Sequence, residues 1–131
     1  MGVMNCYCGN TKPYSECCEV FHRNGGNTAT AEQLMRSRYS AFVLANGDYL
    51  MLSHHSKTRP VREKKAIVAW AKSVNWIKLE VLATQKGNPT DDKGTVTFNA
   101  YFFENGKVDV IHEKSAFVKE KGVWKYLGLS K

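Results

Sequence analysis

The fold of this chain is decided by the stretch TVTFNAYFFENGKVDVI, residues 95–111. Apolar and polar side chains alternate on both sides of Asn105-Gly106, a dipeptide that favours a two-residue type I′ hairpin turn. Such a turn pairs Glu104 with Lys107 and fixes the other cross-strand pairs by counting back from it. The stretch therefore predicts a β-hairpin with a defined register.

This register distributes the side chains over two faces of the sheet. Phe98 faces Glu113, and a second turn at Lys121-Gly122 places Phe117 opposite Tyr126. One face then carries Phe98, Ala100, Phe102, Ile111, Phe117, Trp124 and Tyr126, with Glu113 among them. The other face carries Tyr101, Val108, Val110, Ala116, Val118, Leu127 and Leu129. Because both faces are apolar, we expect helices to cover one, and a second subunit in a homodimer is a candidate cover for the other.

The remaining elements follow from the hydrophobic period along the chain. Thr30 and Gln33 form a capping box, and Asn46-Gly47 is expected to end that helix in the left-handed conformation. The predicted helices span residues 30–45, 49–54 and 61–74, and the predicted strands span 76–83, 95–104, 107–119 and 123–129. Helices followed by an antiparallel meander are typical of the α+β class.

All four cysteines lie near the amino end in a C-x-C-x8-C-C pattern formed by Cys6, Cys8, Cys17 and Cys18. A disulfide framework would spread its cysteines along the chain, so the cluster favours a knuckle in which four thiolates close a tetrahedral Zn²⁺ shell. A closed shell has no open position for chemistry and predicts a tethered binding element. A disulfide pair, an iron–sulfur cluster, and His22 in place of one cysteine are the alternatives.

The segment from Cys6 to Cys18 resembles the SEC-C motif, the zinc knuckle at the C-terminus of the bacterial preprotein translocase motor. The resemblance implies that the four cysteines are the zinc ligands. We expect the knuckle to occupy residues 1–23, a flexible linker rich in Asn and Gly to occupy 24–29, and an α+β domain to occupy 30–131.

Composition and charge limit the classes of protein that fit. With 131 residues, 43% of them hydrophobic, the chain suffices for one globular domain and a small appendage. No apolar run is long enough to span a membrane, and no secretory signal precedes Cys6, so a cytoplasmic location is expected. The net charge is +7. The basic segment, residues 57–65, contains Lys57, Arg59, Arg62, Lys64 and Lys65. It predicts either a solvated helix face or weak association with nucleic acid or the ribosome.

Glu113 is a carboxylate that the register places among aromatic side chains. Such a group must either pair or shift its pKa. Its candidate partners by residue type are Arg36, Arg38, His54, Lys78 and Tyr126. One interpretation is a structural ion pair with an arginine of the first helix, and the other is a general acid or base oriented by Arg36 or His54. His54 and His55 also fit a helix C-terminus, which favours an imidazolium, and His112 falls on the opposite face.

Residues 34–42 (LMRSRYSAF) and 47–50 (GDYL), with His54, Trp76 and 113–117 (EKSAF), resemble the uncharacterised YchJ-like family of bacteria. The resemblance implies a SEC-C knuckle joined to a domain similar to nuclear transport factor 2. In that fold, helices pack on a curved antiparallel sheet and form a cystatin-like cone.

These observations lead to three hypotheses about function. The favoured one is a zinc-containing cytosolic binding or adaptor protein, whose knuckle contacts a protein or ribosomal partner and whose cone binds a small ligand. The second is a small-molecule enzyme of isomerase, dehydratase or hydrolase type, with Glu113 as proton carrier and Arg36 or His54 orienting it. The third is weak association with nucleic acid through residues 57–65.

Overall fold

The computed structural model of the chain describes residues 5–130. Residues 1–4, at the start of the expected knuckle segment, and Lys131, at the end of the expected domain, lie outside the described residues. The elements follow in the order η1 (Tyr14–Glu16), α1 (Cys18–Arg23), α2 (Ala31–Val43), α3 (Gly47–Leu52), η2 (Val61–Glu63), α4 (Lys64–Ser73), β1 (Asn75–Lys86), β2 (Lys93–Glu104), β3 (Lys107–Glu120) and β4 (Val123–Leu129).

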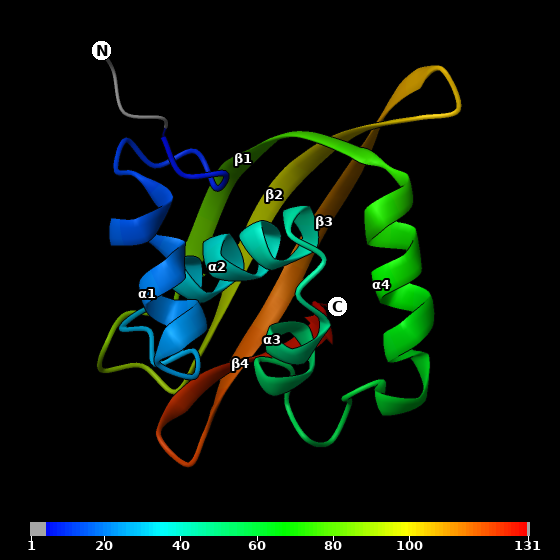
Figure 1. The fold of residues 1–131 in the computed structure, drawn as a ribbon. Helices are drawn as coiled ribbons and strands as arrows, with labels where there is room; N and C mark the ends of the chain where they lie inside the picture. Colours follow the sequence, from blue (N-terminus) through cyan, green and yellow to red (C-terminus); the bar gives the residue numbers. More distant parts are fainter. Residues whose placement is uncertain (1–4, 131) are drawn as a thin grey trace.

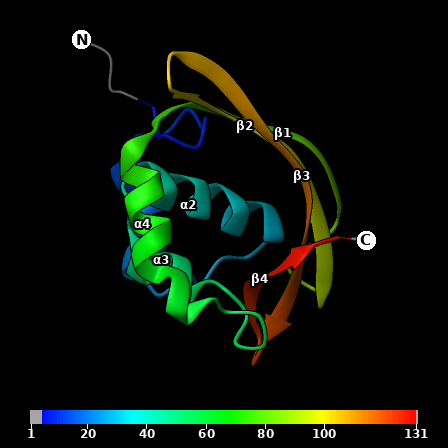
Figure 2. The same cartoon turned by 90° about the vertical axis from the view of Figure 1, so that its right-hand side faces the viewer.

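The four strands form one antiparallel sheet in the order β1-β2-β3-β4, so each strand pairs with its neighbours in sequence. The sheet is curved, with α2 lying in its hollow and α3 and α4 on the open side of the hollow (Figures 1 and 2). The expected α+β class, with helices packed on a curved antiparallel sheet, is therefore confirmed.

The register of the central hairpin is the predicted one. Asn105 and Gly106 both have positive φ, as a type I′ turn requires, and Phe98 pairs with Glu113. The later pairs are also as predicted, namely Phe117 with Tyr126 and Lys119 with Trp124. Register shifts interrupt the β1–β2 pairing twice and the β3–β4 pairing once. Such bulges increase local twist and bend strands, which contributes to the curvature of the sheet.

The boundary between α2 and α3 differs from the expected one. As predicted, the Thr30 hydroxyl accepts the Gln33 N–H at the start of α2. After α2, the left-handed residue is Ala45, with a φ of 54°, and not Asn46 or Gly47. The Asn46 side chain instead accepts a backbone N–H in the first turn of α3, which Gly47 begins. The expectation was wrong because Asn46 serves as the N-cap of the next helix.

The core lies between α2 and the concave face of the sheet. Leu34 and Tyr39 of α2 are buried together with Phe117 and Trp124 of the strands. The Trp124 indole N–H donates to the backbone oxygen of Ala29 at 3.1 Å, which joins β4 to the residues just before α2. The face that carries Glu113 is thus the one that the helices cover.

The convex face of the sheet carries apolar side chains beside charged and polar ones, and the described residues leave it uncovered. Its exposed large apolar side chains include Phe103, Val108 and Val110. Leu129 was expected on this face, but the register shift between Ala116 and Phe117 pairs it with Ser115, which faces the concave side, so that expectation was wrong. Among the described helices, none has the length and apolar character needed to cross a membrane.

Candidate functional site

The four cysteine thiols converge beside α1. Their sulfur atoms all lie within 4.8 Å of one another, and none of the four residues is more than 8% exposed. Gly9 takes a positive φ directly after Cys8, and η1 then leads the chain back to Cys17 and Cys18. The cysteines are free, so the disulfide alternative does not apply. Four close thiols of this kind can hold one metal ion.

The surroundings of the four sulfurs affect the individual thiols differently. Asn10 Nδ2 donates to Cys17 Sγ at 3.3 Å. The side-chain hydrogen bond with Cys18 lowers the pKa of Cys8 to about 5, and the same contact raises the pKa of Cys18. Burial raises the pKa of Cys17, so a cation bound by all four thiols would have to displace their protons.

The knuckle packs directly against α2. Arg36 Nη1 donates to the backbone oxygen of Cys8 at 2.7 Å, while Arg36 Nε pairs with Glu32 at 2.9 Å. The Cys18 thiol in turn lies 3.5 Å from the backbone oxygen of Arg36, to which it donates. The expectation of a tethered knuckle is therefore wrong, because polar groups of the knuckle find their partners on α2.

His22 belongs to this interface and not to the thiol cluster. Its Nε2 donates to the backbone oxygen of Ser37 at 2.8 Å, and its Nδ1 accepts from the Tyr14 hydroxyl at 2.8 Å. Burial lowers the pKa of His22, which agrees with a neutral ring in these roles. Because both ring nitrogens are engaged, the alternative in which His22 replaces a cysteine ligand does not fit the structure.

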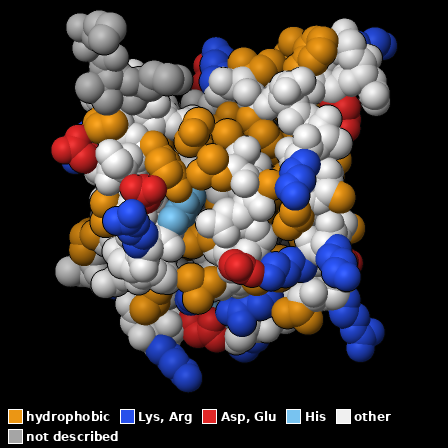
Figure 3. Space-filling model, in the orientation of Figure 1, with side chains coloured by type: hydrophobic (Ala, Val, Ile, Leu, Met, Phe, Trp, Pro, Cys, Tyr) orange, Lys and Arg blue, Asp and Glu red, His pale blue; other side chains and the backbone are white. Residues whose placement is uncertain are grey.

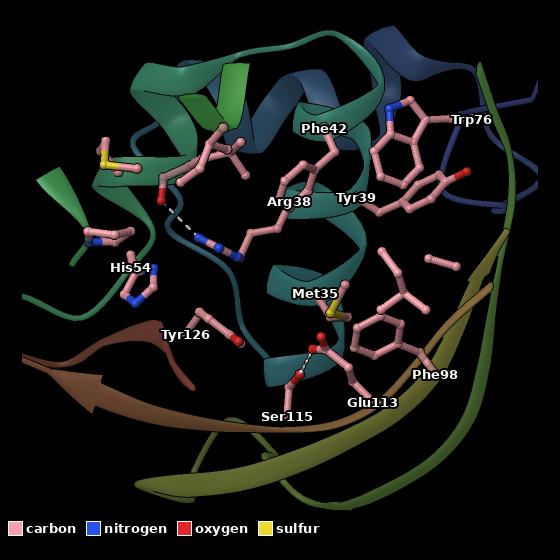
Figure 4. A pocket seen from close by; sticks show the side chains of 16 residues that line it. Met35, Arg38, Tyr39, Phe42, His54, Trp76, Phe98, Glu113, Ser115 and Tyr126 are labelled. Atoms are coloured by element: carbon pink, nitrogen blue, oxygen red, sulfur yellow. Dashed lines mark hydrogen bonds between the residues drawn. The ribbon is translucent and has the colours of Figure 1, made fainter. Parts of the chain in front are cut away.

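A second candidate site is a cavity of about 240 Å³ between α2, α3, α4 and the concave face of the sheet. Its lining is mostly apolar, and its polar members are Arg38, His54, Glu113, Ser115 and Tyr126. Trp76, Tyr39 and Phe42 lie at one end, His54 and Tyr126 lie at the other, and Glu113 and Ser115 rise from the sheet (Figure 4). A mostly apolar cavity with a few polar groups is typical of small-molecule sites.

Arg38 extends from α2 toward the end of α3 and is 6% exposed. Its Nη1 donates to the backbone oxygen of Leu50 at 2.9 Å and to the Ser53 hydroxyl at 2.7 Å. Its guanidinium carbon lies 4.5 Å from the centre of the Tyr126 ring, a cation–π contact. Burial lowers the pKa of Arg38 to about 10, so the group is still a cation at neutral pH.

Glu113 reaches the cavity without forming an ion pair. Its Oε2 accepts from the Ser115 hydroxyl at 3.3 Å. Within the described residues, no lysine, arginine or histidine nitrogen lies within 4.0 Å of the Glu113 carboxylate. The structural ion pair with an arginine of the first helix is therefore a wrong interpretation, because Arg36 is turned to the knuckle and Arg38 to the end of α3.

The structure separates the other residues that were grouped with Glu113. Arg36 lies at the knuckle and not in the cavity, so it does not orient this carboxylate. Lys78 lies 3.7 Å from Glu80 and over the Tyr101 ring, on the convex face. His112 bonds there to Asn99, on the face opposite Glu113 as predicted.

His54 lines the cavity as a neutral imidazole. It is 9% exposed, and its ring packs edge-on against that of Tyr126. Burial and the positive charges of Arg38 and Arg59 lower its pKa to about 4. The interpretation of His54 as a cation at a helix end is wrong, since Arg38, Arg59 and Lys125 already donate to the last carbonyls of α3 and its following turn.

Basic side chains gather over α4 and the loop before it (Figure 3). Within the basic segment, Arg59 donates to the backbone oxygen of His54, and Lys64 pairs with Asp48. Lys57, Arg62 and Lys65 are exposed. Part of the positive charge of the basic segment is therefore neutralised or turned inward. This favours the interpretation as a solvated helix face over association with nucleic acid.

Sequence reasoning missed the role of Arg38, which entered only as one of several partners of Glu113. A signal was present, because Arg38 follows Met35 by three residues and precedes Phe42 by four, on the apolar stripe of its helix. A charged residue at core spacing indicates a buried functional or structural group.

Fold and site together define a class, an α+β cone similar to nuclear transport factor 2 with a four-cysteine knuckle at its amino end. The family model described as YchJ, middle NTF2-like domain, matches residues 30–128. The chain belongs to this YchJ family, whose relatives carry the name UPF0225.

Relatives and solved structures support this assignment. A UPF0225 protein of Vibrio cholerae is 41% identical over 124 residues, which span 95% of this chain and 81% of the relative. One from Shewanella sp. is 40% identical over 128 residues, which span 93% and 77%. The solution structure of a SEC-C motif containing protein from Rhodopseudomonas palustris matches with a TM-score of 0.86 at 32% identity, over 97% of this chain and 98% of that one. A crystal structure of a SEC-C motif containing protein from Psychrobacter arcticus has a TM-score of 0.81 at 32% identity, over 99% and 85%.

Proposed function

We propose that this protein is a zinc-containing binding protein of the cytoplasm, with a structural zinc site in the knuckle and a small-ligand site in the cone. The observation that carries the proposal is the cavity of about 240 Å³, which has Arg38, His54 and Glu113 in an otherwise largely apolar wall. The division into residues 1–23, 24–29 and 30–131 is part of the proposal. It assigns the zinc to the first segment and the ligand to the last.

In this proposal Cys6, Cys8, Cys17 and Cys18 are the zinc ligands. Their mutual distances and their burial support it, since zinc prefers a tetrahedral shell and four thiolates complete one. With all four positions taken by the protein, the ion contributes folding free energy and has no open position for a substrate. The reducing cytoplasm would keep the thiols free for the metal.

The ligand site is tested with a small neutral aromatic molecule, 3-phenylpropanamide, added to ¹⁵N-labelled protein. We expect chemical-shift changes at residues that line the cavity, with a dissociation constant of about 1 mM or tighter for a molecule of this size. Ala100→Phe, which fills part of the cavity, should abolish them, and Ala69→Phe on the exposed face of α4 should not. Shifts that are absent, or that survive Ala100→Phe, would contradict a ligand site in the cone.

An adaptor role for the knuckle is the second candidate. A groove of about 340 Å³ runs between the knuckle and α2, and its lining includes Lys12, Glu16 and Val20. Val20 is 44% exposed, so an apolar side chain stands beside charged ones, as in a protein contact. A protein or ribosomal partner would bind at this groove.

Turnover of a ligand in the cone would use Glu113 as the proton carrier. Its hydrogen bond from Ser115 supports that role, and His54 at the far end of the cavity is the second group able to exchange a proton. Such chemistry fits an isomerase, dehydratase or hydrolase, and it would proceed without Arg36.

A further inference from the structure

Arg38 presents a free edge of its guanidinium to the cavity of the cone. Nη1 is occupied by the Leu50 oxygen and the Ser53 hydroxyl, whereas Nε and Nη2 have no acceptor among the described residues. No fully enclosed side-chain nitrogen of the described residues lacks a partner, so Nε and Nη2 are not fully enclosed, and Arg38 is one of the residues that line the cavity. Their two N–H groups are parallel, and this edge matches the two oxygens of a carboxylate.

The free edge is unusual because it belongs to a deeply buried charge. Arg38 is 6% exposed, and a buried cation is costly unless a counter-ion compensates it. Among the described residues, no carboxylate oxygen lies within 4.0 Å of its nitrogens. Glu113 shares the cavity only at longer range, with its carboxylate turned to Ser115 (Figure 4). Residues 5–130 therefore supply no direct counter-ion to Arg38.

The surroundings of Arg38 add further positive charge. Lys125 Nζ donates to the Leu52 oxygen at 2.7 Å, and Arg59 Nε and Nη2 donate to the His54 oxygen at 3.1 and 2.9 Å. The end of α3 beside the cavity thus collects three cations, and one carboxylate, Glu120, interacts with Lys125 there. Such a concentration of positive charge favours an anion at the polar end of the cavity.

The other end of the cavity determines the body of the ligand. Phe42, Trp76 and Phe98 supply aromatic walls there (Figure 4). The volume of about 240 Å³ lies below the range of about 300–1,000 Å³ that is usual for drug-sized ligands. The occupant is therefore small and largely apolar apart from its anionic group.

We propose, on the basis of the ligand site proposed above, that the cone binds a small carboxylic acid as its carboxylate. The two carboxylate oxygens accept from Nε and Nη2 of Arg38, and the apolar body lies against Phe42, Trp76 and Phe98. A carboxylate suits the site better than a phosphate dianion, because one free guanidinium edge is available and Glu113 shares the cavity.

The experiment compares probes of nearly equal shape and different charge on the full chain. Dissociation constants of 3-phenylpropanoate, 3-phenylpropanamide and 3-phenylpropylamine are measured by the same NMR titration. We expect the carboxylate to bind at least about tenfold more tightly than the amide, since a hydrogen bond to a charged group adds that much, and the ammonium to bind most weakly. Equal binding of carboxylate and amide would overturn this inference and leave the ligand site intact. Binding of none of the probes would contradict the ligand site itself.

Three variants locate the anion. Glu113→Gln removes the competing carboxylate and should raise the ratio of carboxylate affinity to amide affinity several-fold. Arg38→Lys keeps the charge but loses the Nε–Nη2 edge, so the carboxylate-to-amide ratio should fall toward one. Glu63→Gln, an exposed carboxylate outside the cavity, is the matched control for Glu113→Gln and should change neither constant.

These variants also separate the site from general attraction to a basic protein. The net charge of +7 can attract any anion to the surface. A carboxylate preference that is unchanged in Glu113→Gln would place the anion outside the cone and overturn the proposal. Because Arg38→Lys could disturb the end of α3, the Glu113→Gln result decides the question even if the lysine variant fails to fold.

Discussion

At the scale of single residues, the buried charge of Arg38 sets the state of its neighbours. Arg38 donates to the Leu50 carbonyl and Arg59 to the carbonyl of His54 itself, so a proton on the His54 ring would bring a further positive charge close to both guanidinium groups. This is why burial and nearby cations lower the pKa of His54. The cavity consequently holds one fixed cation, one neutral imidazole and the Glu113 carboxylate.

The lowered pKa of His54 predicts a loss of stability in mild acid. The folded-state pKa of about 4 lies below the ordinary histidine pKa of 6.5, so the unfolded chain binds more protons. The contribution of His54 is complete above pH 6.5 and declines as the pH falls from 6.5 toward 4. His54→Asn should therefore flatten the fall in free energy of unfolding between these values, measured by urea denaturation.

The comparison requires that the other charged and titratable groups around His54 are the same in both proteins. Arg38, Arg59 and His55 face it with positive charge, and Glu113 and Tyr126 line the same cavity. The buried His22 has a lowered pKa as well and adds to the slope of the parent protein. The exposed His112→Asn serves as the control. An identical slope in the parent and His54→Asn proteins would show that His54 titrates as it does in the unfolded chain.

At the scale of elements, the helices are placed by close contacts that the sequence pattern does not reveal. Gly47 opens α3 at the point where it meets α4. A Cβ atom at this position would lie 2.6 Å from Val68 Cγ2 and 3.2 Å from Lys64 Cε. The glycine is thus required by the approach of two helices and not by a positive φ.

This contact predicts the effect of a methyl group at the α3–α4 junction. Gly47→Ala should lower the free energy of unfolding by about 1–3 kcal/mol, because the added methyl overpacks the junction. Removing the opposing methyl groups in Gly47→Ala/Val68→Ala should recover part of that loss. A double-mutant cycle in urea measures the coupling, with the Val68→Ala single variant as its reference. If the effects of the two substitutions on the free energy of unfolding were strictly additive, the added methyl group would not interact with Val68. The two helices would then have moved apart without loss of stability.

At the scale of the whole molecule, the knuckle and the cone form one packed unit. Arg36 reaches the backbone of the knuckle from α2, and His22 reaches the backbone of α2 from the knuckle. Loss of structure at the thiol cluster would therefore remove contacts from the helix that carries Arg38. A tethered knuckle would have no such effect on the cone.

Removal of the metal tests whether the knuckle and the cone are stabilised as one unit. Protein purified under reducing conditions should contain one equivalent of zinc by mass spectrometry, and Cys17→Ser should contain almost none. Chelation should lower the melting temperature of the whole chain, by about 4 °C for each kcal/mol lost in a protein of this size. Ser15→Ala, exposed and next to the cluster in sequence, is the control for Cys17→Ser.

A second variant separates the packing of the knuckle on α2 from metal binding. Arg36→Met should keep the zinc but lower the melting temperature, because the Cys8 carbonyl loses its donor. Arg62→Met, at an exposed position, should leave it unchanged. If chelation and Arg36→Met both left the melting temperature of the cone unaltered, the knuckle would be an independent element.

Much of the fold was predictable because its signals are local. The Asn105-Gly106 turn and strict alternation fixed the register of β2 and β3, and hence the face on which Glu113 lies. The thiol cluster was equally local, since its members lie within residues 6–18. The partner of Glu113 was missed, because it is the Ser115 hydroxyl two residues along the same strand, while the two arginines considered as partners turn to other groups.

The amino-acid sequence by itself determined the antiparallel meander, the register of its central hairpin and the set of thiols, because each depends on neighbours along the chain. Which apolar face the helices cover was decided by the tertiary structure. Only the tertiary structure decided that Arg36 binds the knuckle while Arg38 enters the cavity. Those two side chains lie two residues apart on one helix, and about 200° of rotation sends them to different partners. The direction of each is set by packing between distant segments, which no local pattern encodes.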